Sequence, residues 1–160
     1  MPRIQLPEGN DSESLRLMRL QPAMGNAMGV LADAIYNKSS LAVRVREAVR
    51  MRIAQLNHCQ LCLDFRFDGL SEQGIDEQFY AAVSSYRQAS IFSAAEILAI
   101  EYAERFAQAH SAIDDAFIEQ LKAHFSDQEI YELSVTIAGL IANGRVLQVL
   151  QVDQLCTLNT

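Results

Sequence analysis

Two cysteines separated by two residues are the feature of this sequence that points most directly to chemistry. Cys59-Gln60-Leu61-Cys62 forms a CxxC motif, and the pattern predicts that a helix begins at Cys59 and ends at Gly69. The free N–H groups and the dipole at a helix N-terminus stabilise a thiolate. Two sulfurs at this spacing can close a disulfide across one helical turn. In a reducing cytoplasm such a pair is expected to be a reversible dithiol rather than a structural crosslink.

Two other interpretations of the cysteine pair stay open. The cysteines could be small buried hydrophobic residues, or they could be half of a zinc site. The residues that could complete such a site are His58, His110, His124 and Cys156. We expect His110 and His124 to be structural residues at helix ends, Cys156 to be an incidental thiol near the C-terminus, and the protein to hold no metal or cofactor.

Glu47 is the carboxylate best placed in sequence to serve the cysteines. It lies twelve residues before Cys59, and its helical neighbours Val43, Met51 and Ala54 form an apolar row. If this row faces inward, a chain break at Asn57-His58 would fold Glu47 back towards the cysteines, where it could take or give the thiol proton. The alternative is a surface ion pair with Arg50 at three-residue spacing, and spacing alone favours it.

The distribution of proline predicts an all-α fold. All three prolines lie in the first 22 residues, and proline is the strongest helix breaker. Sustained alternation of apolar and polar residues, which would indicate strands, is missing. We expect an N-terminal arm over 1–14, one compact helical bundle over 15–153 and a tail over 154–160. We expect a short first helix that ends near Leu20. Further helices are expected over 23–36, 41–56, 59–69, 77–86, 94–110, 115–124 and 127–152. Expected caps are Ser12 or Ser14, Ser40, Asp76, Ser93, Asp114 and Ser126, and the last helix is expected to kink or break near Asn143-Gly144.

Charge and hydropathy exclude several classes of protein. The chain has 160 residues, 13 Lys and Arg against 20 Asp and Glu, and a formal charge of -7. This balance argues against nucleic-acid binding and against a polybasic membrane anchor. We read no membrane-spanning apolar run and no secretory signal. We therefore expect a cytoplasmic protein without nucleic-acid or membrane partners.

The order of these residues resembles the carboxymuconolactone decarboxylase/AhpD-like (alkylhydroperoxidase) family. The resemblance rests on Arg46-Glu47-Ala48-Val49, on the twelve-residue step from Glu47 to Cys59, and on the CxxC itself. It implies an all-α bundle that assembles into homo-oligomers, commonly trimers or hexamers. In the AhpD-like branch the dithiol reduces hydroperoxides. That branch implies a peroxidatic Cys62, a resolving Cys59 and a proton relay that starts at Glu47.

The sequence departs from the redox branch at two positions. The family's His four residues after the second cysteine is replaced by Arg66, and the His between the cysteines is replaced by Leu61. On one continuous helix Arg66 would share a face with Cys59 and Cys62 and could stabilise a thiolate. Arginine cannot release its proton, so we expect the relay to be broken or rerouted through His58 or water. Arg66 could equally form a salt bridge to Asp64, Asp68 or Glu47.

These observations are compatible with three alternative functions. The first is a thiol-dependent peroxidase or disulfide oxidoreductase acting on a small-molecule hydroperoxide or on a partner protein's disulfide. The second is a non-redox decarboxylase-type enzyme in which Glu47 and Arg66 hold a carboxylate substrate. The third is an oligomeric binding protein that keeps the fold without catalysis.

Overall fold

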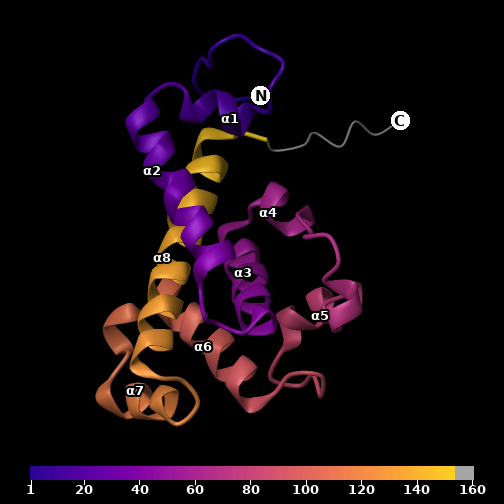
Figure 1. Ribbon diagram of the computed structural model, residues 1–160, viewed down its shortest axis with the longest axis vertical. Coiled ribbons are helices and arrows are strands. Elements are labelled where there is room, and N and C mark those ends of the chain that lie inside the picture. Colours follow the sequence, from indigo (N-terminus) through magenta and orange to yellow (C-terminus); the bar gives the residue numbers. More distant parts are fainter. Residues whose placement is uncertain (154–160) are drawn as a thin grey trace.

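A computed structural model describes residues 1–153, and this part of the chain is helical and contains no strand (Figure 1). The expected all-α bundle is therefore confirmed. The helices are α1 (Glu13–Met18), α2 (Pro22–Asp33), α3 (Val43–Asn57), α4 (Gln60–Asp64), α5 (Glu77–Ala82), α6 (Ala94–Gln108), α7 (Asp115–Lys122) and α8 (Asp127–Leu150). A π-helical turn, η1 (Ala34–Lys38), continues α2, and short 3₁₀ turns cover 71–73, 83–85 and 110–112.

Local capping explains where several helices begin. Ser93 with Glu96 and Ser126 with Glu129 form the two expected capping boxes at the starts of α6 and α8. The side chains of Asp76 and Asp114 cap α5 and α7 by accepting backbone N–H groups, and Ser12 caps α1 in the same way.

The central helix α3 packs on two sides at once. One hydrophobic cluster joins Val45, Val49 and Ile53 of α3 to α6, α7 and α8. A second cluster joins Ala48 and Met51 of α3 to α5 and to Ile100 of α6. Because both sides are covered, three charged residues of α3, Arg46, Glu47 and Arg50, are also buried.

The long helix α8 forms one edge of the molecule and runs beside α2 (Figure 1). By length and composition alone α8 could span a membrane, although we had expected no such run. Leu133 and Ile137 lie in the core against α3 and α6. The apolar character of α8 is therefore partly explained by packing inside the bundle.

Three local expectations were wrong. Ser40 does not cap α3, because its backbone N–H and hydroxyl both donate to the carboxylate of Glu132 on α8. The helix after Cys59 ends at Asp64 rather than at Gly69. The last helix runs through Asn143-Gly144 without a break and ends at Leu150.

The N-terminal arm is tied to the end of α8. The Arg3 backbone N–H donates to the Leu150 carbonyl, and its guanidinium donates to the Val149 carbonyl. The first backbone N–H groups of α1, on Glu13 and Ser14, donate to the Asp153 carboxylate. These bonds hold α1 over the C-terminal end of α8.

Candidate active site

The turn that carries the cysteines is made by the end of α3. His58 has a left-handed backbone conformation, with φ of 51°. Its N–H donates to the Gln55 carbonyl, and the Cys59 N–H donates to the Ala54 carbonyl. This pairing is a Schellman motif, which reverses the chain direction after a helix. The expected break at Asn57-His58 is confirmed, and it sets Cys59 at the start of α4.

Asn57 fixes this turn onto α8. Its side-chain amide donates to the carbonyls of Leu140 and Ile141, and its Oδ1 accepts from Arg145. The close approach depends on Gly144, because a Cβ there would lie 2.5 Å from Asn57 Nδ2. Gly144, which we expected to break α8, instead admits the Asn57 side chain.

Cys59 and Cys62 form a disulfide, with 5.2 Å between their Cα atoms. This separation lies within the usual range for disulfides. The two sulfurs differ in access: Cys59 is wholly buried, whereas Cys62 is partly exposed and lines a cavity. A molecule entering the cavity would therefore meet Cys62 before Cys59.

The cavity has a volume of about 830 Å³ and lies between α1, α2, α3, α4 and α8. Most of its wall is apolar and includes Met28, Ile53, Leu61 and Leu147. A volume of this size is typical of small-molecule sites. Leu61, which lies between the two cysteines, contributes to the apolar wall.

Glu47 lies at the centre of a buried polar network beside this wall. Its Oε2 accepts from Arg50 Nε at 2.8 Å and from the Tyr80 hydroxyl at 3.0 Å. The side chains of Glu47 and Arg50 are 0% and 3% exposed, so the surface ion pair that spacing favoured is wrong. Burial, followed by the charge of Glu47, raises the pKa of Tyr80, which keeps its phenol a proton donor to the carboxylate.

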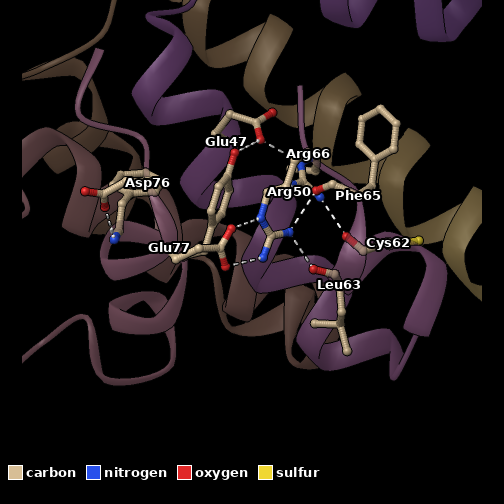
Figure 2. A network of polar contacts seen from close by, with 10 residues as sticks. Glu47, Arg50, Cys62, Leu63, Phe65, Arg66, Asp76 and Glu77 are labelled. Carbon is tan, nitrogen blue, oxygen red and sulfur yellow. Dashed lines mark hydrogen bonds and ion pairs between the residues drawn. The ribbon is translucent and has the colours of Figure 1, made fainter. Parts of the chain in front are cut away.

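Arg50 connects this network to the cysteine helix. Its Nη1 donates to the Cys62 carbonyl at 2.7 Å and its Nη2 donates to the Phe65 carbonyl at 3.1 Å. Figure 2 shows the Cys62 carbonyl facing Arg50 and the sulfur pointing away from it. Arg50 thus holds the end of α4 in place while the Cys62 sulfur stays free of the network.

Arg66 takes a different direction from the one that a continuous helix predicts. Because α4 ends at Asp64, Arg66 does not share a helical face with the cysteines. Its guanidinium pairs with Glu77 and donates to the Leu63 carbonyl (Figure 2). The guanidinium also lies 4.1 Å from the centre of the Tyr80 ring. Hydrogen bonding to Arg66 lowers the pKa of Glu77. The partner of Arg66 is therefore Glu77, and not Asp64, Asp68 or Glu47.

The structure does not bring all the candidate site residues together. Arg50 and Cys62 line the cavity, but Glu47, His58 and Arg66 do not. His58 is exposed at the turn. Within residues 1–153 no three His, Cys, Asp or Glu side chains gather in a way that could hold a metal ion. Cys156 lies outside the described residues.

Two residues of this site were not assigned a role from the sequence. Arg50 appeared only as a surface partner of Glu47, and Asn57 only as a helix breaker. The three-residue spacing of Glu47 and Arg50 was the available signal for the first. The contacts of Asn57 reach more than eighty residues along the chain, so local sequence contained no signal for them.

Known proteins resemble this chain in sequence and in fold. Residues 22–105 match the carboxymuconolactone decarboxylase family. The uncharacterized protein YnjA of Escherichia coli is 37% identical over 100 residues, which cover 62% of this chain and 55% of YnjA. The chain thus matches little more than half the length of that relative.

Two solved structures share the fold. ATU0492 from Agrobacterium tumefaciens, a protein of unknown function assigned to AhpD-type antioxidant defence, superposes with a TM-score of 0.75 at 23% identity, covering 84% of this chain and 92% of that one. A peroxidase-related protein with an alkylhydroperoxidase AhpD core, from Ralstonia eutropha, gives a TM-score of 0.78 at 16% identity, covering 94% and 90%. The match to the family covers more than half of the chain. This chain therefore belongs to the carboxymuconolactone decarboxylase family, and it has the AhpD-like fold.

Proposed function

We propose that the protein is a cytoplasmic thiol-dependent peroxidase or disulfide oxidoreductase that uses Cys62 and Cys59. The observation that carries the proposal is the unequal access of the two bonded cysteines. Cys62 lines the cavity and Cys59 lies buried behind it. This order suits an attacking thiol at the substrate and a resolving thiol next to it.

The chemistry balances with a hydroperoxide as oxidant. The Cys62 thiolate attacks the terminal peroxide oxygen, so an S–O bond forms, the O–O bond breaks and the alkoxide leaves as an alcohol after taking a proton. Cys59 then gives up its proton and attacks the Cys62 sulfur, which forms the disulfide and releases water. A partner protein's dithiol is the reductant that restores both thiols.

Glu47 is proposed as a positioning residue in this reaction. It holds Arg50, which in turn holds the Cys62 carbonyl. His58 and Arg66 lie outside the cavity wall, and their contribution is proposed to be to the turn and to the segment after α4.

The decarboxylase-type alternative receives less support from the geometry. It needs Glu47 and Arg66 to face one substrate, but Glu47 is bound to Arg50 and Tyr80 while Arg66 is bound to Glu77. Neither residue lines the large cavity.

The experiment compares three proteins, all carrying Cys156→Ser so that the third thiol does not confuse the count. The parent, a Cys59→Ser variant and a Cys62→Ser variant are reduced and mixed with one equivalent of tert-butyl hydroperoxide. The parent should lose two thiols and the mass of two hydrogens. Cys59→Ser should stop at a sulfenic acid that dimedone traps, and Cys62→Ser should not react.

Other outcomes separate the alternatives. Peroxide consumption that survives in Cys62→Ser would contradict the assignment of the peroxidatic thiol. If the cysteines of the parent are not oxidised and reduced reversibly, the result would favour a binding protein without catalysis. A decarboxylase activity that survives the loss of both cysteines would favour the non-redox decarboxylase-type enzyme.

A further inference from the structure

Tyr36 lies in the wall of the cavity that Cys62 lines, at a place where the helix is distorted. It belongs to the π-helical turn η1, which follows α2 directly. Single π-helical turns are rare and occur often at functional sites. Nothing in the proposed reaction so far uses this tyrosine.

Aromatic contacts link Tyr36 to the segment after Cys62. The Tyr36 ring lies 4.9 Å from the Phe67 ring, and Phe67 lies 4.7 Å from Phe65. Phe65 also lines the cavity, and its ring is 5.8 Å from the Arg50 guanidinium. These contacts hold the phenol on the same side of the bundle as the cysteine helix.

The proposed reaction needs a proton donor in the cavity. The alkoxide that leaves Cys62 must be protonated, and neither Leu61 nor Arg66 can do this. Arg50 lines the cavity, but a guanidinium does not release its proton. It also donates to Glu47, Cys62 and Phe65.

The Tyr36 hydroxyl is uncommitted, because it makes no hydrogen bond to any other residue within 1–153. The other polar side chains of the wall are amides such as Asn57, the paired hydroxyls of Ser12 and Ser14, and the Asp153 carboxylate, which accepts from two backbone N–H groups of α1. Amides carry no transferable proton near neutral pH. We propose that Tyr36 is the catalytic proton donor to the leaving oxygen of the hydroperoxide. This assignment rests on the proposed peroxidase function.

The electrostatic surroundings of Tyr36 agree with a donor role. Burial raises its pKa, the charge of Glu47 acts in the same direction, and the charges of Arg50 and Arg46 oppose it. The phenol therefore stays protonated at neutral and mildly alkaline pH. An ordinary phenol, with a pKa of about 10, is far more acidic than water, whose pKa is about 15.7, so a phenol can protonate an alkoxide-type leaving group.

The balanced step is simple. As the O–O bond breaks, the leaving oxygen takes the Tyr36 proton and departs as an alcohol, and the phenolate recovers a proton from solvent. A donor with this chemistry gives a rate without an inflection near pH 6.5, whereas a histidine donor would lose activity as it deprotonates.

The test replaces the hydroxyl and keeps the ring. In the Cys156→Ser background, Tyr36→Phe should slow the reaction of the reduced protein with tert-butyl hydroperoxide by about 10²-fold. With peracetic acid the leaving group is a carboxylate that needs no proton, so the same variant should react at the parent rate. Alkylation by iodoacetamide, which releases iodide, should also be unchanged.

A matched tyrosine provides the control. Tyr102 is buried, its hydroxyl pairs with Ser134, and it lies outside the cavity wall. Tyr102→Phe should react with both peroxides at the parent rate.

Each contrary result has a distinct meaning. A parent that reacts with tert-butyl hydroperoxide and a Tyr36→Phe variant that reacts equally fast would overturn the donor role alone. Equal slowing with both peroxides and with iodoacetamide would show that Tyr36 only positions Cys62, which also overturns it. A parent whose cysteines react with neither peroxide would overturn this inference together with the proposed function.

Discussion

Glu47 and Arg50 form an ion pair that solvent does not reach. Glu47 is 0% exposed and also accepts from Tyr80, while Arg50 reaches two carbonyls of the cysteine segment. A buried pair of this kind adds little net stability compared with apolar packing, but removal of one partner leaves an uncompensated charge in the interior. The pair therefore serves to place Cys62 and makes the site sensitive to single substitutions.

We predict that Arg50→Met lowers the free energy of unfolding by about 3–5 kcal/mol, because Glu47 loses its buried counter-ion. Urea denaturation measures this loss. The control is Arg66→Met, whose partner Glu77 is exposed, and which should change stability little. Equal losses in the two variants would contradict the distinction between a buried and a surface ion pair.

The same two variants test the thiol. Arg66 lies outside the cavity wall, so Arg66→Met should leave the rate of Cys62 alkylation and its pH dependence unchanged. Arg50→Met removes the positive charge beside Cys62 and should slow alkylation near pH 7, because the thiolate is less stabilised. Iodoacetamide labelling followed by mass spectrometry gives both rates. Slower labelling in Arg66→Met would restore Arg66 to the thiol site.

At the scale of the elements, contacts between helices decide where the cysteine turn sits. The Asn57 side chain crosses from the end of α3 to the carbonyls of α8, and Gly144 leaves room for it. The loop before α3 is held in a similar way, since Ser39 and Ser40 donate to Glu132 of α8. Both ends of α3 are therefore attached to α8.

We predict that Gly144→Ala destabilises the protein by about 1–3 kcal/mol, because the new Cβ overlaps the Asn57 amide. Thermal and urea unfolding measure the loss. The control is a double-mutant cycle with Asn57→Ala, which removes the overlapped group. Gly144→Ala should cost much less in that background, and an unchanged cost would show that the overlap with Asn57 is not the cause.

The hydrogen bonds to the Glu132 carboxylate predict that the stability of the protein depends on pH. Hydrogen bonds from Gln128, then from Ser39 and Ser40, lower the pKa of Glu132 to about 2. Because the folded pKa lies below the unfolded one, this contribution is complete above about pH 4.3 and is lost as the pH falls towards 2. Glu132→Gln should therefore reduce stability at pH 7 and lose less stability than the parent between pH 5 and pH 2.

Urea denaturation at several pH values measures both effects of Glu132→Gln. The matched control is Glu119→Gln on α7, where the carboxylate pairs with Lys122 of the same helix and does not join two elements. If the free energy of unfolding falls equally with acid in Glu132→Gln and in the parent, Glu132 is not the source of this pH dependence.

At the scale of the whole molecule, several large apolar side chains on two neighbouring helices stay exposed. Met24 and Val30 of α2 are 69% and 67% exposed, and Val149 of α8 is 54% exposed. These two helices lie side by side (Figure 1). Large exposed apolar surfaces on a subunit mark interfaces.

We predict that a second copy of this chain covers exposed apolar side chains of α2 and α8, in an oligomer of at least two subunits and most readily a trimer or hexamer. Val30→Glu places a charge on the exposed surface of α2 and should reduce the mass measured by light scattering at micromolar concentration. Gln120→Glu, on the exposed side of α7, makes the same charge change elsewhere and should leave the mass unchanged. A monomeric mass for the parent would refute the prediction.

Local sequence patterns were enough to predict most of the helices, most of their caps and the pairing of the two cysteines. Proline placement, capping residues such as Ser93 and Asp114, and the CxxC spacing are local patterns, and the structure confirms what they predicted. The tertiary structure alone decided what surrounds the pair. Glu47 and Arg50 look like surface residues in a charged stretch, but α3 is covered on two sides and carries them inward. Arg66 does not lie on the face of the cysteines because α4 ends at Asp64. Tyr36 lies in the cavity wall because of contacts between elements distant in sequence. Such contacts depend on how helices pack over long sequence separations, which local patterns do not encode.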